Sequence, residues 1–329
     1  MNYFQKYLAE EFAEDYQEGR LSRQAALELI SSITGNRGSA GDILNASQPR
    51  AAGEASMRAF TAQARAGVGG FLDQANPAGS SAGTASGSAA PPPEVAPDDP
   101  RIEAGEMRFQ AGPAALQGYL ARPRWDGPHA LVLVCHENRG LTPYVQDVTR
   151  RLAVAGYAAL AIDLLSRSGG SASLSPTDIP GILGNIPPDQ FVSDFLSGYA
   201  FMQQQDYVHK SRAGMVGFCF GGGVTWQVAI HLPELKAAVP YYGPLPPVDQ
   251  VASIQAAVLA IYGGKDQRIN QGIPPVENAM REQHKIFEKI IYPNADHAFH
   301  NFTGTRYDPE AARDAWSHTL DWLRKYLAG

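Results

Sequence analysis

The sequence predicts an α/β fold, in which a mostly parallel sheet is covered by helices on both faces. Three observations lead to this prediction. Short, nearly continuous apolar runs recur along the last two-thirds of the 329-residue chain, helix-like segments separate them, and turn-forming residues bound them. Strands buried on both faces have such continuous apolar runs, and their alternation with helices is typical of parallel sheets.

Eight strands are expected, of which the first two are short and the other six are apolar runs. The expected strands are Glu106–Gln110, Leu116–Arg122, Ala130–Cys135, Ala158–Ile162, Ala213–Gly217, Ala237–Tyr242, Val258–Tyr262 and Lys289–Tyr292. The expected helices are Tyr144–Ala155, Asp189–Gln205, Gly222–His231, Val276–His284 and Pro309–Leu327. In sheets of this kind the functional residues lie at the carboxyl ends of the strands.

Composition divides the chain into three parts. Residues 1–35 form a short helical extension, residues 36–100 a linker, and residues 101–329 the α/β domain. The linker is rich in Ala, Gly, Ser and Pro, which predicts a flexible segment with a stiffer proline end. Met57–Phe71 could form a transient helix within it.

Two helices are expected in the N-terminal extension. An apolar residue recurs at every fourth position of the first: Phe4, Leu8, Phe12 and Tyr16. This spacing places one apolar stripe on one helix face. Ser22 is the expected N-cap of the second helix, and Gly35 its end. We expect a helical hairpin that packs on the main domain or on a second copy of the chain, and we assign it no chemistry.

Charge and cysteine content narrow the class of protein. The formal net charge is −6, which disfavours nucleic acid and anionic membranes as partners. No apolar run of about 18 residues is present, so no membrane span is expected. Two cysteines are too few for a disulfide framework, which points to the cytoplasm. The acidic start is unlike a secretory signal, although the weakly apolar stretch Leu21–Thr34 leaves export open.

The most informative motif is the run Gly217-Phe218-Cys219-Phe220-Gly221-Gly222 between an expected strand and an expected helix. It matches the G-x-nucleophile-x-G elbow, with Cys in place of Ser. The turn is so sharp that only glycine fits two positions before and two positions after the cysteine. The N-terminus of the helix that follows stabilises a thiolate. The alternative is a buried structural cysteine in a glycine-rich turn. A dinucleotide-binding turn is disfavoured because the G-x-G-x-x-G spacing is absent.

Two further loops supply partners for Cys219 in the order nucleophile, acid, histidine. Asp266 follows one expected strand and His297 follows the next. His297 would take the thiol proton, and Asp266 would hold the imidazole in its working tautomer. Asp296 is a competing acid, but adjacent side chains usually point apart. His297 and His300 lack a third ligand that would close a metal site, so neither metal nor cofactor is expected.

A second cluster, His136-Glu137-Asn138-Arg139-Gly140, follows the strand that ends at Cys135. Its loop position suits one half of an oxyanion hole, with backbone N–H groups from Asn138 and, at the elbow, from Phe220. Glu137 beside a thiol would raise the thiol pKa or accept its proton. Alternatively, Glu137 pairs with Arg139.

From Arg101 to Leu327 the sequence resembles the dienelactone hydrolases (carboxymethylenebutenolidases) of the α/β-hydrolase superfamily. The G-F-C-F-G-G elbow, the H-E-N-R-G loop, the G-G-K-D loop and the D-H-A-F loop carry the resemblance. It implies a Cys219–His297–Asp266 triad. It also implies that Glu137 interacts with the resting thiol until substrate displaces it.

The resemblance further implies two arginines that bind a substrate carboxylate. One belongs to a D-L-x-x-R pattern, met here by Arg167. The other lies four residues after the catalytic histidine, where this chain has Asn301, which leaves the narrow dienelactone specificity open. Arg306 could replace it from the same loop. Residues 167–188 are either a mobile lid or an ordinary surface loop.

These observations predict a carboxylic ester hydrolase that cleaves a small lactone or activated ester through an acyl-enzyme. Two alternatives remain at this stage. One is a broader carboxylesterase or thioesterase that uses the same triad. The other is a non-catalytic α/β-hydrolase scaffold that serves as an interaction module.

Overall fold

The computed structural model describes residues 1–46 and 94–328. Most of the expected linker, including Met57–Phe71, lies outside these residues. The described part contains one eight-stranded sheet of order β1-β2-β4-β3-β5-β6-β7-β8. The strands are β1 (Ile102–Ala111), β2 (Ala114–Pro123), β3 (His129–Cys135), β4 (Ala158–Asp163), β5 (Val208–Phe218), β6 (Leu235–Tyr241), β7 (Ala257–Gly263) and β8 (Phe287–Tyr292).

The sheet is mostly parallel, as predicted. β2 pairs antiparallel with both β1 and β4, and all the other pairs are parallel. All eight expected strands are present, and β5 begins five residues earlier than the apolar run at Ala213 indicated. The early part of β5 is partly exposed, so it lacks the apolar signal by which the strand was recognised.

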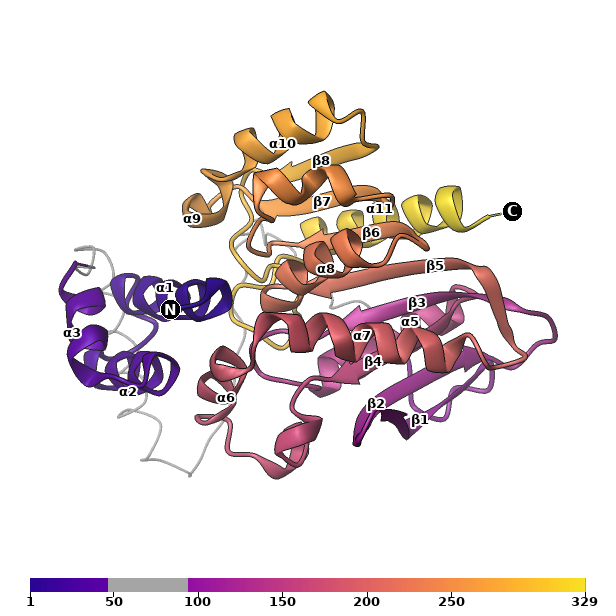
Figure 1. Ribbon diagram of the computed structural model, residues 1–329, viewed down its shortest axis with the longest axis horizontal. Coiled ribbons are helices and arrows are strands. Elements are labelled where there is room, and N and C mark those ends of the chain that lie inside the picture. The colour runs from indigo at the N-terminus through magenta and orange to yellow at the C-terminus, as the bar shows by residue number, and fades with distance from the viewer. Residues whose placement is uncertain (47–93, 329) are drawn as a thin grey trace, which may run out of the picture.

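The five expected helices of the α/β domain are also confirmed. They are α5 (Pro143–Val154), α7 (Pro188–Met202), α8 (Phe220–His231), α10 (Ile273–Glu282) and α11 (Pro309–Leu327). Figure 1 shows α7 and α8 over one face of the sheet and α5 and α11 over the other. This arrangement buries the central strands on both sides, which explains their continuous apolar sequences.

The N-terminal segment contains three helices, where the sequence indicated two. They are α1 (Tyr3–Gln17), α2 (Arg23–Thr34) and α3 (Arg37–Ala46). Ser22 caps α2 by accepting from the Ala25 N–H, and Gly35 ends it with a positive φ of 67°, both as expected. The linker was therefore predicted to begin too early, because α3 is rich in Gly, Ala and Ser and resembles linker in composition.

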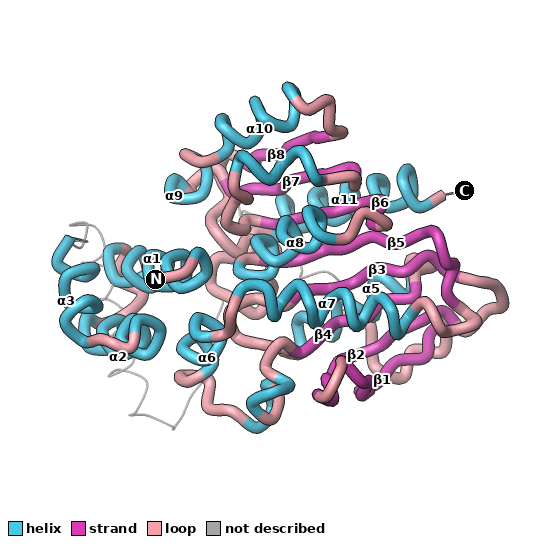
Figure 2. The backbone as a smooth tube through the Cα atoms, in the orientation of Figure 1, coloured by secondary structure: helices cyan, strands magenta, loops and turns pink. Residues whose placement is uncertain are grey.

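The three helices lie beside the loops at one end of the sheet, next to the start of α8 (Figure 2). α1 packs against α2, α3, α8 and the short helix α6 (Ile179–Asn185). α6 belongs to the stretch 167–188, which also contains two short 3-10 helices, η1 (Ser166–Ser168) and η2 (Ser171–Ser173). A Cβ at Gly184 would lie 2.9 Å from the side chain of Ile33, so α6 and α2 approach closely.

Within residues 1–46 and 94–328, no helix combines the length and the apolarity that crossing a bilayer requires.

Candidate active site

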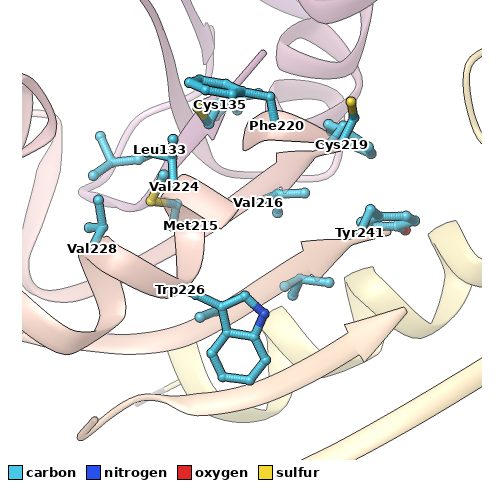
Figure 3. Packing of buried hydrophobic residues seen from close by; sticks show 14 of the residues in the cluster. Leu133, Cys135, Met215, Val216, Cys219, Phe220, Val224, Trp226, Val228 and Tyr241 are labelled. Carbon is cyan, nitrogen blue, oxygen red and sulfur yellow. The ribbon is translucent and has the colours of Figure 1, made fainter. Parts of the chain in front are cut away.

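Cys219 occupies a sharp turn between β5 and α8. Its φ is +56°, in the region that non-glycine residues rarely adopt. A Cβ at Gly217 would lie 2.1 Å from the Gly221 carbonyl oxygen, and one at Gly221 would lie 2.5 Å from the His136 carbonyl oxygen. Both positions therefore require glycine. Figure 3 shows Cys219 at this junction, with Phe220 and Val224 following along the helix.

His297 and Asp266 meet beside this turn. The Nδ1 atom of His297 lies 2.6 Å from Oδ2 of Asp266. Asp296, the competing acid, instead accepts from the backbone N–H of His297 at 2.7 Å. The Sγ atom of Cys219 lies within 4.8 Å of the His297 imidazole, although no direct hydrogen bond joins them among the described residues. Asp266 therefore occupies Nδ1 of His297 and leaves Nε2 available to other partners near the thiol.

Two side chains of α1 fill the space between the thiol and the imidazole. The hydroxyl of Tyr7 lies 3.2 Å from Sγ of Cys219 and 3.5 Å from Nε2 of His297. The thiol donates to the Glu11 carboxylate at 3.5 and 3.6 Å. Oε1 of Glu11 lies 3.7 Å from Nε2 of His297. The N-terminal segment therefore contributes directly to this site, contrary to our expectation that it carries no chemistry.

Asn138 and Phe220 border the same space. The backbone N–H of Phe220 acts on the Cys219 thiol in the direction that lowers its pKa, against the larger effect of burial. The side-chain amide of Asn138 donates to Oε1 of Glu11 at 3.2 Å. Both residues thus lie next to the thiol, one at the N-terminus of α8 and the other in the loop after β3.

Known proteins resemble this chain over most of its α/β domain. The sequence model described as "Dienelactone hydrolase family" matches residues 116–327. The chain belongs to the dienelactone hydrolase family. A "Putative carboxymethylenebutenolidase" of Methylorubrum extorquens is 35% identical over 245 residues, which are 70% of this chain and 84% of that protein. One of Escherichia coli K12 is 35% identical over 244 residues, with 70% and 89% coverage.

A solved structure gives the same result. The "Putative Dienelactone Hydrolase" of Klebsiella pneumoniae superposes with a TM-score of 0.64 at 33% sequence identity, and the match covers 68% of this chain and 99% of that one. The chain is therefore a hydrolase of the dienelactone hydrolase family with the α/β-hydrolase fold. The family match begins at residue 116, so α1, α2 and α3 lie outside it.

Glu137 does not hold the position that the dienelactone hydrolase resemblance implied. Its Oε2 atom accepts from the side-chain amide of Asn301 at 2.5 Å, and its Oε1 atom has no hydrogen-bond partner within the described residues. The carboxylate in contact with the thiol is that of Glu11. The physical reason is that the Asn301 amide, at the position where the resemblance implied an arginine, donates to Glu137, while α1 brings another carboxylate to the sulfur.

Burial and negative charge favour the neutral form of the Cys219 thiol. Burial raises the pKa of Cys219 well above its ordinary value, and the nearby carboxylates of Glu11 and Glu137 raise it further. Burial alone would raise the pKa of Asp266, but the charge and hydrogen bond of His297 hold it below its usual range. The resting site therefore combines a neutral thiol with an ionised Asp266.

Glu137 predicts a pH dependence of stability. Burial raises its pKa from 4.5 to about 7 in the folded protein. Between those values the folded state retains a proton that the unfolded chain has lost, so stability falls as pH rises through this window. We expect Glu137→Gln to leave stability unchanged near pH 4 and to increase it by about 1–3 kcal/mol at pH 8. Urea unfolding at both pH values measures this, with the exposed Glu282→Gln as the control. Equal effects at both pH values would contradict the prediction.

The two expected substrate-binding positions are occupied by internal partners. Arg167 donates to Oδ1 of Asp194 at 2.7 Å, and Asn301 binds Glu137. Two other arginines face α1. Nε of Arg268 lies 3.0 Å from Oε2 of Glu14, and Nη1 of Arg306 lies 3.4 Å from Oδ1 of Asp15.

Nearby acidic groups stabilise both of these cations. Burial alone would lower the pKa of Arg306, but Asp15 and Glu11 raise it. Burial likewise opposes the charge of Arg268, but the carboxylates of Glu11, Asp266 and Glu14 raise its pKa.

The only candidate metal ligands that gather among the described residues belong to this same site. The ligand atoms of Glu11, Cys219 and His297 lie within 4.8 Å of one another. Carboxylate, thiolate and imidazole are donors that suit zinc. A bound ion would, however, occupy the thiol and the imidazole nitrogen of the expected triad. His300 is separate from this group, because its Nδ1 atom lies 2.6 Å from the Tyr144 hydroxyl.

Sequence analysis missed Tyr7, Glu11 and Arg268. A signal for the first two was present, since they lie four residues apart on one helix face beside the apolar stripe. A carboxylate on the buried side of an amphipathic helix is costly unless a hydrogen-bond donor or a cation pairs with it, so its presence there indicates a specific partner. Phe4 anchors this face, with its ring centroid 4.8 Å from that of Phe220 and 5.3 Å from that of Phe191. Burying one such ring contributes about 1.5–3 kcal/mol.

Proposed function

We propose that this dienelactone hydrolase family member hydrolyses a lactone or an activated carboxylic ester with a Cys219–His297–Asp266 triad. The observation that carries the proposal is the 2.6 Å contact between Nδ1 of His297 and Asp266, beside a cysteine on a strained elbow. That contact fixes the tautomer in which Nε2 accepts a proton. Nucleophile, base and orienting acid are the three parts that acyl transfer needs.

In the proposed reaction, His297 takes the thiol proton and the Cys219 sulfur attacks the substrate carbonyl. The backbone N–H groups of Phe220 and Asn138 stabilise the tetrahedral oxyanion. The C–O bond then breaks, and the alcohol or enol leaves with the proton from His297. In a lactone the leaving group remains attached to the acyl-enzyme. Water activated by His297 then cleaves the thioester and restores the thiol.

A thiol nucleophile suits substrates with good leaving groups. An enolate leaves without strong acid assistance, so an enol-lactone or aryl ester matches the chemistry of Cys219. The curated relatives are named carboxymethylenebutenolidases, which supports a lactone. The proposal also includes a reducing compartment such as the cytoplasm, which the free thiols of Cys135 and Cys219 support.

One observation favours a broader ester or thioester substrate over a strict dienelactone. The position of the second family arginine is Asn301, and its amide is bound to Glu137. A neutral amide cannot form the bidentate pair with a carboxylate that arginine forms. The second candidate function is therefore a general carboxylesterase or thioesterase activity of the same triad.

A substrate panel tests the proposed function and separates these candidates. We expect the wild-type protein to hydrolyse neutral aryl esters and neutral lactones at least as well as anionic dienelactones, and Asn301→Arg to shift kcat/KM toward the anionic substrates by about tenfold. The exposed Thr305→Arg, on the same loop, controls for added charge. Absence of turnover for every ester, thioester and lactone would reject the proposed function.

A further inference from the structure

α1 covers the candidate nucleophile. The residues of the triad are nearly inaccessible, with Cys219, Asp266 and His297 each 2% exposed. Tyr7 and Glu11 contact both the thiol and the imidazole, and each of these two residues is itself only 3% exposed. In the described structure, α1 therefore lies in the space through which a substrate would have to reach Cys219.

An acyl substrate and α1 compete for this space. The substrate carbonyl carbon must come within roughly 3–3.5 Å of the sulfur before attack. The Tyr7 hydroxyl and the Glu11 carboxylate already lie 3.2–3.6 Å from that sulfur. Oε1 of Glu11 also takes a hydrogen bond from Asn138, which borders the proposed oxyanion position. Both side chains have to leave before a carbonyl can take up that geometry.

We propose that α1 is an intramolecular cover that inhibits the site and has to move away from Cys219 before substrate binds. This inference rests on the proposed function for its effect on turnover, but not for its effect on access to the thiol. The alternative is that Tyr7 relays the proton from sulfur to His297 during catalysis. A relay needs α1 in place at the moment when the substrate needs its space, so the geometry favours the cover.

Charged contacts at the edge of the site hold the cover in place. Arg268 and Arg306 of the α/β domain pair with Glu14 and Asp15 of α1. Arg268 also lies over the Tyr7 ring, 4.8 Å from its centroid. These contacts lie next to the triad without touching the sulfur. Removing the two acidic side chains should therefore loosen α1 without removing a group that contacts the nucleophile.

Alkylation of Cys219 by iodoacetamide measures access directly. We expect the wild-type thiol to react at least about tenfold more slowly than the Glu14→Ala/Asp15→Ala variant. The observed alkylation rate is proportional to the fraction of molecules in which α1 has moved away from Cys219, and the double variant should increase that fraction. Rates are followed up to the high-pH plateau, which separates access from a change in thiol pKa. Glu10→Ala is the matched control, since Glu10 lies on the same helix with its side chain 44% exposed and, within residues 1–46 and 94–328, forms an ion pair with Lys6 alone. Cys219→Ser identifies any labelling of Cys135.

The outcomes are separable. Faster labelling of the double variant, with Glu10→Ala unchanged and kcat/KM raised in parallel, supports the cover. Equal plateau rates for wild type and the double variant, or a wild-type rate equal to that in urea, would overturn it. Faster labelling with slower hydrolysis would also overturn it, because α1 would then assist the reaction. Faster labelling in a protein that hydrolyses no ester would leave the cover standing and reject the proposed function.

Discussion

Cys219→Ala is expected to reduce kcat/KM for an activated ester by at least about 10⁴-fold, since in the proposed mechanism the sulfur is the atom that forms the acyl-enzyme. The side chain is buried and small, so its truncation to alanine should cost only about 1 kcal/mol of stability. Folding and activity can therefore be separated in one variant. Ester hydrolysis together with a urea unfolding curve makes the measurement.

Cys135→Ala is the matched control for this variant. Cys135 is also a buried cysteine, at the end of β3, and within the described residues it is not among the hydrogen-bond or ion-pair partners of His297 and Glu11. We expect it to keep activity within the same order of magnitude as wild type. Full activity in Cys219→Ala, or equal losses in the two alanine variants, would contradict the assignment of the nucleophile.

Asp266→Asn is expected to lower kcat by about 10³–10⁴-fold with little change in fold. The asparagine amide would donate to Nδ1 of His297, which places the imidazole proton on Nε2. His297 could then no longer accept the thiol proton. Oδ1 of Asp266 also accepts from the Ile269 N–H at 3.2 Å, and asparagine keeps that cap. The loss should therefore be catalytic.

Asp296→Asn separates the two neighbouring acids. Asp296 accepts from the backbone N–H of His297, and asparagine can do the same. We expect this variant to retain most of the wild-type kcat. If Asp296→Asn lost as much activity as Asp266→Asn, the orienting acid would be assigned incorrectly.

The fold was predictable from sequence because its central strands are buried on both faces. The runs that became β3 to β7 are continuously apolar, so their number and type could be recognised without tertiary information. Boundaries were less certain where a segment was exposed, as in the first half of β5. α3 was missed because its Gly, Ala and Ser content also suits a linker.

The elbow and the loop positions of Asp266 and His297 were predictable because local sequence determines them. The two glycines flank Cys219 within one short motif, so the elbow could be recognised even though the contact that excludes a Cβ at Gly221 comes from the distant His136 carbonyl. Asp266 and His297 each lie in the loop that follows a strand. The position of Glu137 was not predictable, because it depends on Asn301, more than 160 residues away. The contribution of Tyr7 and Glu11 was hidden for the same reason, since only the packing of α1 brings them to Cys219.

Trapping the acyl-enzyme tests the central claim most directly. Wild-type protein is quenched in acid during turnover of an aryl acetate, digested, and analysed by mass spectrometry. The triad predicts one acetyl group on the peptide that contains Cys219, released by hydroxylamine and absent from Cys219→Ala. An acetyl group on another residue, or turnover with unmodified Cys219 throughout, would contradict it.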